Sequence, residues 1–297
     1  MTIDFRVKRS EDCITIDTKA WITSSNIGIT IHRMSGRDIP TFITKVISVN
    51  PVVESLKGLV KTGDTVLLSR IASDISQYKK FAVKVGDDRY FNAPIMQVLG
   101  VFNGEISFES LSLLTDKILI EKIETDVNGI ILSKDNTMVG RVLKTGTNRF
   151  DKDWNKFPLT IKQGDIVLVR DNVTTEITLN SKRYYITEEP MIVGVFKEAR
   201  YDLNSLQLMN DYIILDSYIP EQMGKLFTPI MDYEEADYTQ IYDRDLFKVV
   251  KTPDNIDNIF ENDILLIDRN YTNYVYLGAK RYFVLAGTEY ISARVNK

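Results

Sequence analysis

Short apolar runs broken by Gly, Asn and Asp recur along the whole chain, and none shows sustained 3.6-residue spacing. Residues 177–179 and 184–186 form two such runs on either side of the polar stretch 180–183, a pattern typical of two strands joined by a hairpin. Residues 117–123 alternate polar and apolar positions, which predicts a strand with one face in water. Short strands at close spacing favour a small barrel or sandwich, so the sequence predicts an all-β fold.

One group of residues occurs three times in the same order. The hexapeptide Gly-Asp-Thr-Val-Leu-Leu at 63–68 recurs as Gly-Asp-Ile-Val-Leu-Val at 164–169 and as Asn-Asp-Ile-Leu-Leu-Ile at 262–267. Each copy precedes a basic-aromatic-aromatic triplet, and the triplets stand at 89–91, 183–185 and 281–283. The copies begin 101 and 98 residues apart, and a steady period predicts tandem domains. We therefore expect three small domains, at residues 1–106, 107–200 and 201–297.

The repeated groups are best explained by the fold. A Gly-Asp pair suits a turn that needs an unusual backbone angle, and the Val, Ile and Leu residues after it suit a core strand. The two aromatic residues of each triplet are expected to alternate between core and surface. Because these groups recur in all three copies, we expect them to maintain the fold rather than to form a functional site.

Composition and charge narrow the classes of partner. Hydrophobic content of 44% and charged content of 26% are ordinary for a folded globular chain. The net charge of −4 and the lack of a Lys/Arg cluster argue against nucleic acid as a partner. The single cysteine, Cys13, excludes an intrachain disulfide and fits a reducing compartment. The sequence shows no signal-peptide core and no stretch approaching ~20 apolar residues, so we expect a cytosolic-type chain without a membrane span.

Residues suited to catalysis or metal binding are scarce. His32 is the sole histidine and lies near no cysteine, which favours a surface or loop position. The sequence has no Cys-x-x-Cys, no His-Glu-x-x-His and no glycine-rich phosphate loop. The acidic run at 232–237 lacks the ligand spacing of a calcium loop and suits a solvated face better. We expect no enzymatic activity, no cofactor and no metal site.

The second copy holds a fixed order of elements between residues 116 and 197. These are an opening strand at 116–122, a loop containing Asn128-Gly129-Ile130-Ile131-Leu132, a strand at 138–146, a polar segment at 147–155, a Gly-Asp turn and strand at 161–167, and closing strands at 184–186 and 192–196. This order resembles the GroES-like co-chaperonins, the small lids of the chaperonin folding cage. The resemblance implies a roof hairpin between Asn148 and Pro158. Pro190 stands near the last strand, where the family usually carries Asp.

The first and third copies resemble the family in part. The loop region at 26–31 has Thr30 within its apolar run, and the corresponding loop of the third copy lies at 223–227. In the third copy only the part from Asn262 onward matches well. The resemblance implies an all-β chain of three tandem small GroES-like β-barrel domains, with the strongest match in the middle domain.

The sharpest functional candidate is the loop segment Gly129, Ile130, Ile131 and Leu132. In the family a glycine followed by three apolar residues docks a mobile loop onto the partner, and burying such side chains returns about 1.5–3 kcal/mol each before ordering costs. A loop that becomes ordered on binding also gives a reversible contact. The alternative interpretation is an ordinary buried strand that starts at Gly129 and runs into Leu132.

Two functions remain open at the level of sequence. The first is a non-enzymatic, co-chaperonin-like ring protein that contacts a chaperonin, or another large protein assembly, through the middle loop. It implies a homo-oligomer in the cytoplasm of a bacterium or of a phage-infected host. The second is a structural or assembly protein of a phage particle, located in the virion and built from the same barrels. A small-molecule carrier has no residue signature in its favour.

Overall fold

The computed structural model describes residues 13–17, 42–49, 56–68, 82–85, 88–123, 126–127, 130–131, 138–151, 153–170, 174–198, 200–218, 244–277 and 280–295. Across these ranges the chain is almost entirely β-structure, and no α-helix occurs among them, which confirms the all-β prediction there. Short 3-10 helices are present at η3 (Ile95–Gln97), η4 (Glu189–Met191) and η6 (Arg269–Tyr271). No helix in the described ranges has the length and apolar character needed to cross a membrane.

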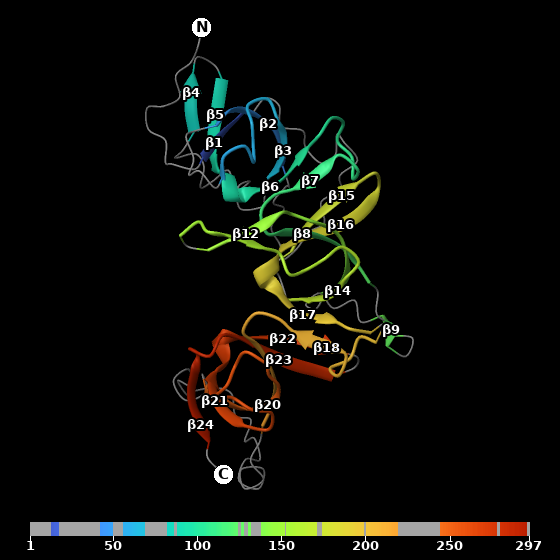
Figure 1. Cartoon of the computed structure of the whole chain (residues 1–297), viewed down its shortest axis with the longest axis vertical. Helices are drawn as coiled ribbons and strands as arrows, with labels where there is room; N and C mark the ends of the chain where they lie inside the picture. The colour runs from blue at the N-terminus through green and yellow to red at the C-terminus, as the bar shows by residue number, and fades with distance from the viewer. Residues whose placement is uncertain are drawn as a thin grey trace, which may run out of the picture. The chain divides into compact units, whose positions relative to one another are not determined.

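Most strands belong to three large sheets (Figure 1). The first sheet contains, in spatial order, β4 (Ala82–Val85), β5 (Asp88–Pro94), β1 (Cys13–Asp17), β2 (Phe42–Val49), β3 (Thr65–Leu68), β6 (Val98–Phe102) and β7 (Leu111–Leu113). The second contains β15 (Thr175–Leu179), β16 (Lys182–Glu188), β8 (Lys117–Lys122), β11 (Met138–Thr145), β14 (Ile166–Val169), β17 (Ile192–Phe196) and β18 (Leu206–Leu208). The third contains β22 (Thr272–Leu277), β23 (Lys280–Ala286), β19 (Tyr212–Ser217), β20 (Arg244–Lys251), β21 (Ile264–Asp268) and β24 (Ile291–Val295).

The three sheets share one order of strand pairing. In each sheet a hairpin pairs with one edge of the opening strand, which is β1, β8 or β19. On its other edge come the next two strands of the same sheet and then a closing strand, which is β6, β17 or β24. The closing strands β6, β17 and β24 carry the same irregularity, because the register against β3, β14 and β21 shifts at Leu67/Leu68, Leu168/Val169 and Leu266/Ile267. The first and second sheets then add one further strand, β7 or β18, whereas the third sheet ends at β24 within the described residues.

The chain packs as two compact units. One comprises residues 1–122, 141–165 and 174–189, and the other comprises residues 123–140, 166–173 and 190–297. In the first unit, one core is built mainly by the first sheet and is also contacted by Phe150 and Trp154, and a second core joins side chains of β3, β6 and β7 to those of β8, β15 and β16. In the second unit, one core joins β14, β17 and β18 to β19, β22 and β23, and another lies within the third sheet. The domain ranges 1–106, 107–200 and 201–297 stay a prediction.

The turn before the third strand of each sheet is built in the same way three times. Gly63, Gly164 and Asn262 have φ values of 91°, 95° and 73°, as the Gly-Asp pattern predicts. The following aspartate accepts a hydrogen bond from the backbone N–H three residues earlier, at 2.7 Å for Asp64, 2.8 Å for Asp165 and 2.9 Å for Asp263. The backbone of each turn also bonds to one residue of the preceding strand, namely Val46, Val142 or Val249.

Both hairpins expected in the second copy are present. Strands β15 and β16 pair from Thr175↔Ile186 to Leu179↔Lys182, and the two residues between them, Asn180 and Ser181, have φ values of 51° and 63°. Two successive positive φ angles characterise the tight turn that matches strand twist. The second hairpin joins β12 (Asn148–Phe150) to β13 (Lys156–Pro158), with Asn148 opposite Pro158.

The expectation for residues 117–123 is wrong at the start of the strand. Lys117, Ile118, Leu119 and Ile120 are all buried, so β8 does not keep one face in water there. The pattern misled because a charged residue normally marks the wet face. Lys117 is instead buried, and its ammonium group pairs with Asp116 and Glu188.

Candidate functional site

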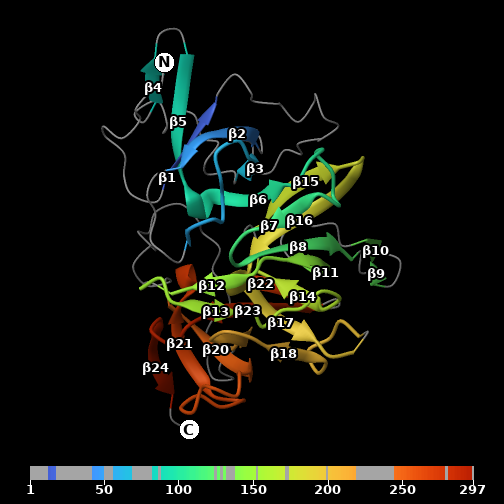
Figure 2. The ribbon, with the colours of Figure 1, turned by 45° about the horizontal axis from the view of Figure 1, so that its top comes forward.

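The predicted partner-binding segment lies in the loop between β8 and β11. The Ile123 N–H donates a hydrogen bond to the Val139 carbonyl at 2.8 Å and closes the base of this loop. Within it, β9 (Asp126–Val127) pairs with β10 (Ile130–Ile131) as a separate two-stranded sheet (Figure 2), with Ile130 opposite Val127. Thus Ile130 and Ile131 form β10, whereas Gly129 and Leu132 lie outside the described residues.

The strand that leads into this loop is anchored by a buried ion pair. Lys117 is 2% exposed, and its Nζ lies 2.8 Å from both Asp116 Oδ1 and Glu188 Oε1. Burial lowers the pKa of Lys117, but the two carboxylates outweigh it, so the pKa is raised above 10.5. The cation therefore ties β8 to the end of β16 while its charge is kept.

The hairpin β12–β13 is held at its base by Glu189. This carboxylate is 1% exposed and accepts hydrogen bonds from Thr160 N at 2.6 Å, Thr160 Oγ1 at 2.8 Å and Ile161 N at 3.1 Å. The Arg149 guanidinium of β12 approaches the same carboxylate at 3.9 Å and lies 5.8 Å from the Phe157 ring centre. Phe157 itself is 41% exposed. The hairpin thus has a fixed base and presents an aromatic side chain to solvent.

Two lysines in equivalent positions hold the loops that precede β7 and β18. Lys144 Nζ donates to the carbonyls of Phe108 at 2.6 Å, Leu111 at 2.9 Å and Glu109 at 3.2 Å. Lys251 Nζ donates to the Leu203 carbonyl at 2.8 Å. In both loops a serine, Ser110 or Ser205, folds back onto carbonyls of its own loop. The two loops are therefore closed by the same chemistry.

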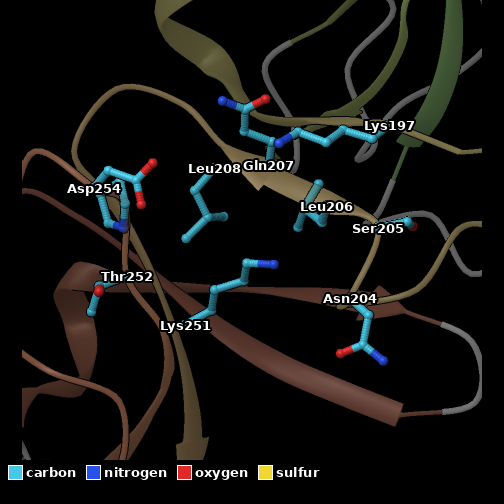
Figure 3. Close-up of a pocket in the computed structure, with 10 residues that line it drawn as sticks. Lys197, Asn204, Ser205, Leu206, Gln207, Leu208, Lys251, Thr252 and Asp254 are labelled. Carbon is cyan, nitrogen blue, oxygen red and sulfur yellow. The ribbon is translucent and has the colours of Figure 1, made fainter.

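The second of these loops borders a hollow of about 220 Å³, shown in Figure 3. Leu206 and Leu208 of β18 point towards Lys251, which projects from the opposite wall. Lys197 and Asp254 also line the hollow. A small, mainly polar space of this kind offers no apolar pocket for a ligand, and the contact of Lys251 with the Leu203 carbonyl maintains the fold.

Sequence reasoning missed the roles of Lys117, Glu189 and Lys144. For Lys144 a signal existed: the turns place Val46, Val142 and Val249 at equivalent positions, so the residue two places later is Ser48, Lys144 or Lys251. The lysine stands in the second and third sheets, each of which follows one of the loops that precede β7 and β18, and the first sheet has Ser48 there. For Lys117 and Glu189 the partners are distant in sequence, and no local pattern marks them.

The remaining candidates from the sequence are metal-binding groups, the loops of the first and third copies, and the aromatic triplets. No group of three or more His, Cys, Asp or Glu residues that could hold a metal ion occurs in the described ranges. His32, the acidic run at 232–237 and the loops at 26–31 and 223–227 all lie outside those ranges. In the triplets, Tyr184 is buried and Tyr185 is half-buried, while Tyr282 is half-buried and Phe283 is buried.

Comparison with known proteins gives matches in the middle of the chain. The family model described as the chaperonin 10 Kd subunit matches residues 110–196. Co-chaperonin GroES of Halalkalibacterium halodurans is 33% identical over 91 residues, which are 29% of this chain and 97% of that protein. Co-chaperonin GroES of Elusimicrobium minutum is 30% identical over 99 residues, 32% of this chain and 99% of that protein. The protein of that name in Chlamydia felis is 35% identical over 88 residues, 28% and 86% of the two chains.

Proposed function

Because the chain belongs to the chaperonin 10 Kd subunit family through residues 110–196, we propose that it is a non-enzymatic, co-chaperonin-like protein. Its partner would be a chaperonin, contacted through Gly129, Ile130, Ile131 and Leu132. The observation that carries the proposal is the extent of the match, which includes the whole loop between β8 and β11 and nearly the full length of the relatives.

The loop has properties that suit docking. Its base is closed by the Ile123–Val139 hydrogen bond, and Ile130 and Ile131 pair with β9 rather than with the seven-stranded sheet. Three adjacent aliphatic side chains would contribute about 1.5–3 kcal/mol each when buried on a partner, before the cost of ordering the loop. That balance favours a contact that forms and dissociates.

We propose further that the chain carries three modules of the same GroES-like β-barrel. Three observations support this: the shared order of strand pairing, the same register shift in each closing strand, and the turn that recurs with its aspartate hydrogen bond. The modules differ in their loops, and only the middle one carries an uninterrupted glycine-plus-three-aliphatics segment. The chaperonin contact is therefore assigned to that module.

The test replaces Ile130, Ile131 and Leu132 together with Ser. We expect binding to a purified bacterial chaperonin, measured with and without adenine nucleotide, to weaken by more than about 100-fold, because little apolar area remains to bury. The melting curve should be unchanged. Phe157→Ser is the matched control, since it removes an exposed apolar side chain from the hairpin β12–β13 and should leave binding intact.

A large drop in melting temperature for the triple variant would place these residues in the core and contradict the docking role. Intact chaperonin binding by that variant, or no binding by the wild-type chain, would favour the alternative of a phage structural or assembly protein. Self-association into a ring and a cytoplasmic location are further predictions from the family. A native mass measurement of the purified chain tests the first directly.

A further inference from the structure

The closing strands of the first two sheets accept an additional strand at a position with no room for a side chain. Strand β7 pairs with β6 through Gly100↔Leu113, and β18 pairs with β17 through Gly194↔Leu208. A Cβ at Gly100 would lie 2.7 Å from the Ser112 carbonyl oxygen, and one at Gly194 would lie 2.5 Å from the Gln207 carbonyl oxygen. Real Cβ atoms do not approach backbone this closely, so the added strand requires glycine there.

The added strand also buries the residues beside that glycine. Leu99 and Val193, which immediately precede Gly100 and Gly194, are 4% and 0% exposed. Their carbonyls accept hydrogen bonds from Leu114 N at 3.0 Å and Met209 N at 2.9 Å, just past the added strands. On the neighbouring strand, Leu67 and Leu168 are both 0% exposed. The pairings β6–β7 and β17–β18 are called junctions below. At each junction the added strand covers buried apolar side chains.

The third sheet has a different set of residues at the same positions. The registers of β6, β17 and β24 align Gly100 and Gly194 with Ala293, which carries a Cβ. The preceding residue is Ser292, and both residues are exposed. Leu266, the equivalent of Leu67 and Leu168, is only half-buried. A strand added to β24 in the same register would collide with the Ala293 methyl group.

The next residue of β24 reinforces this difference. Arg294 occupies the position of Val101 and Val195, and its side chain is 45% exposed. The guanidinium is held 2.7 Å from Asp263 Oδ1, on the turn of its own sheet, and lies 5.7 Å from the Phe260 ring centre. Charged residues on an exposed edge strand discourage pairing with another chain.

The first sheet differs in sequence at the position of the lysine that holds each of these loops. Lys144 and Lys251 hold the loops that precede β7 and β18, and each comes from the sheet that follows the junction. The residue at the corresponding position of the first sheet is Ser48. The sequence thus has neither a lysine at position 48 nor a glycine at position 293.

We propose that the residues at these positions of the closing strand determine whether a further strand can pair with it. Ser292, Ala293 and Arg294 then prevent such pairing at β24. Strand addition then joins the modules twice within each chain and does not join one copy of the chain to the next. Self-association of copies must use another surface. This inference rests on the equivalence of the three sheets and not on binding to a chaperonin.

The test extends the chain by a fourth module. Residues 197–297 are duplicated and attached after Val295, so that the second copy supplies its own linking strand and its own Lys251. One extended chain keeps the native β24, and the other carries Ser292→Val, Ala293→Gly and Arg294→Val, which match β17. Hydrogen exchange over 291–295 is compared in both chains and in the natural protein. Exchange over 193–208 checks that both extended chains fold.

We expect exchange over 291–295 to match the natural protein in the first extended chain and to be at least about tenfold slower in the second. Equal protection in both extended chains would show that β24 is open to strand addition and would overturn the proposal. Lack of protection in the substituted chain, with normal exchange over 193–208, would also overturn it, because the three residues would then not be the determinant.

Discussion

Two lysines, the buried Lys117 and the half-buried Lys144, show how the partner of a cation sets its pKa. Burial acts in the same direction on both and lowers the pKa. For Lys117, Asp116 and Glu188 more than compensate, and the pKa is raised. For Lys144, the contacts are neutral carbonyls and only Glu109 opposes burial, so the pKa is lowered. Carboxylates stabilise the charged form by a full opposite charge, whereas a carbonyl offers only a dipole.

Replacing Lys117 with Met should destabilise the protein by about 3 kcal/mol. The substitution removes the partner of Asp116 and Glu188, and breaking a buried pair costs about 3–5 kcal/mol; the lower end applies because Glu188 is 45% exposed. The free energy of unfolding in urea measures this. Lys182→Met is the control, since its pair with Glu121 lies at the surface and should matter much less. Equal losses in the two variants would contradict the role given to Lys117.

Alkaline pH gives a second readout of the same substitution. The folded pKa of Lys117 is raised above its usual value of 10.5. The stabilisation is therefore fully present below that value and is lost as the pH rises through the folded pKa. The difference in unfolding free energy between wild type and Lys117→Met should be constant at lower pH and should shrink above 10.5. All other titratable groups are common to both chains, so their contributions cancel.

At the level of elements, the sequence predicted what neighbouring residues determine. The turn Asn180–Ser181 and the hairpin from Asn148 to Pro158 depend on residues close in the chain, and both are present. The positive φ at Gly63 and Gly164 follows from glycine itself. The burial of Lys117 could not be predicted, because Glu188 lies 71 residues away. Strand β7, within the predicted range 107–200, pairs with the first sheet, and only the registers reveal this.

The third turn offers a prediction about an element. Asn262 holds a φ of 73° where the other two turns have glycine. Asn262→Ala should lower the unfolding free energy by about 1 kcal/mol, because a left-handed conformation strains an ordinary side chain, whereas Asn262→Gly should have little effect. Asn258→Ala makes the same chemical change at an exposed residue outside the positive-φ set. If Asn262→Gly costs as much as Asn262→Ala, the side chain rather than the backbone angle is responsible.

At the level of the whole molecule, shared cores connect consecutive sheets. Leu206 and Leu208 of β18 belong to a cluster that also contains Val193 of the second sheet and Val275 and Val284 of the third. The first unit repeats this arrangement, with Leu111 and Leu113 of β7 packed alongside side chains of β15 and β16. A change within this shared cluster should therefore loosen both sheets, whereas a change within the core of one sheet should act mainly on that sheet.

Leu206→Ala tests this coupling. Leu206 is 1% exposed, so truncation should cost about 2–5 kcal/mol. Because its cluster spans two sheets, hydrogen exchange should accelerate both in β17 and in β22 and β23. Leu265→Ala is the matched control: Leu265 is also 1% exposed, but its cluster lies within the third sheet, so β17 should keep its exchange rate. An unchanged rate in β17 for Leu206→Ala would mean that the second and third sheets are independent, and that β18 links them by the chain alone.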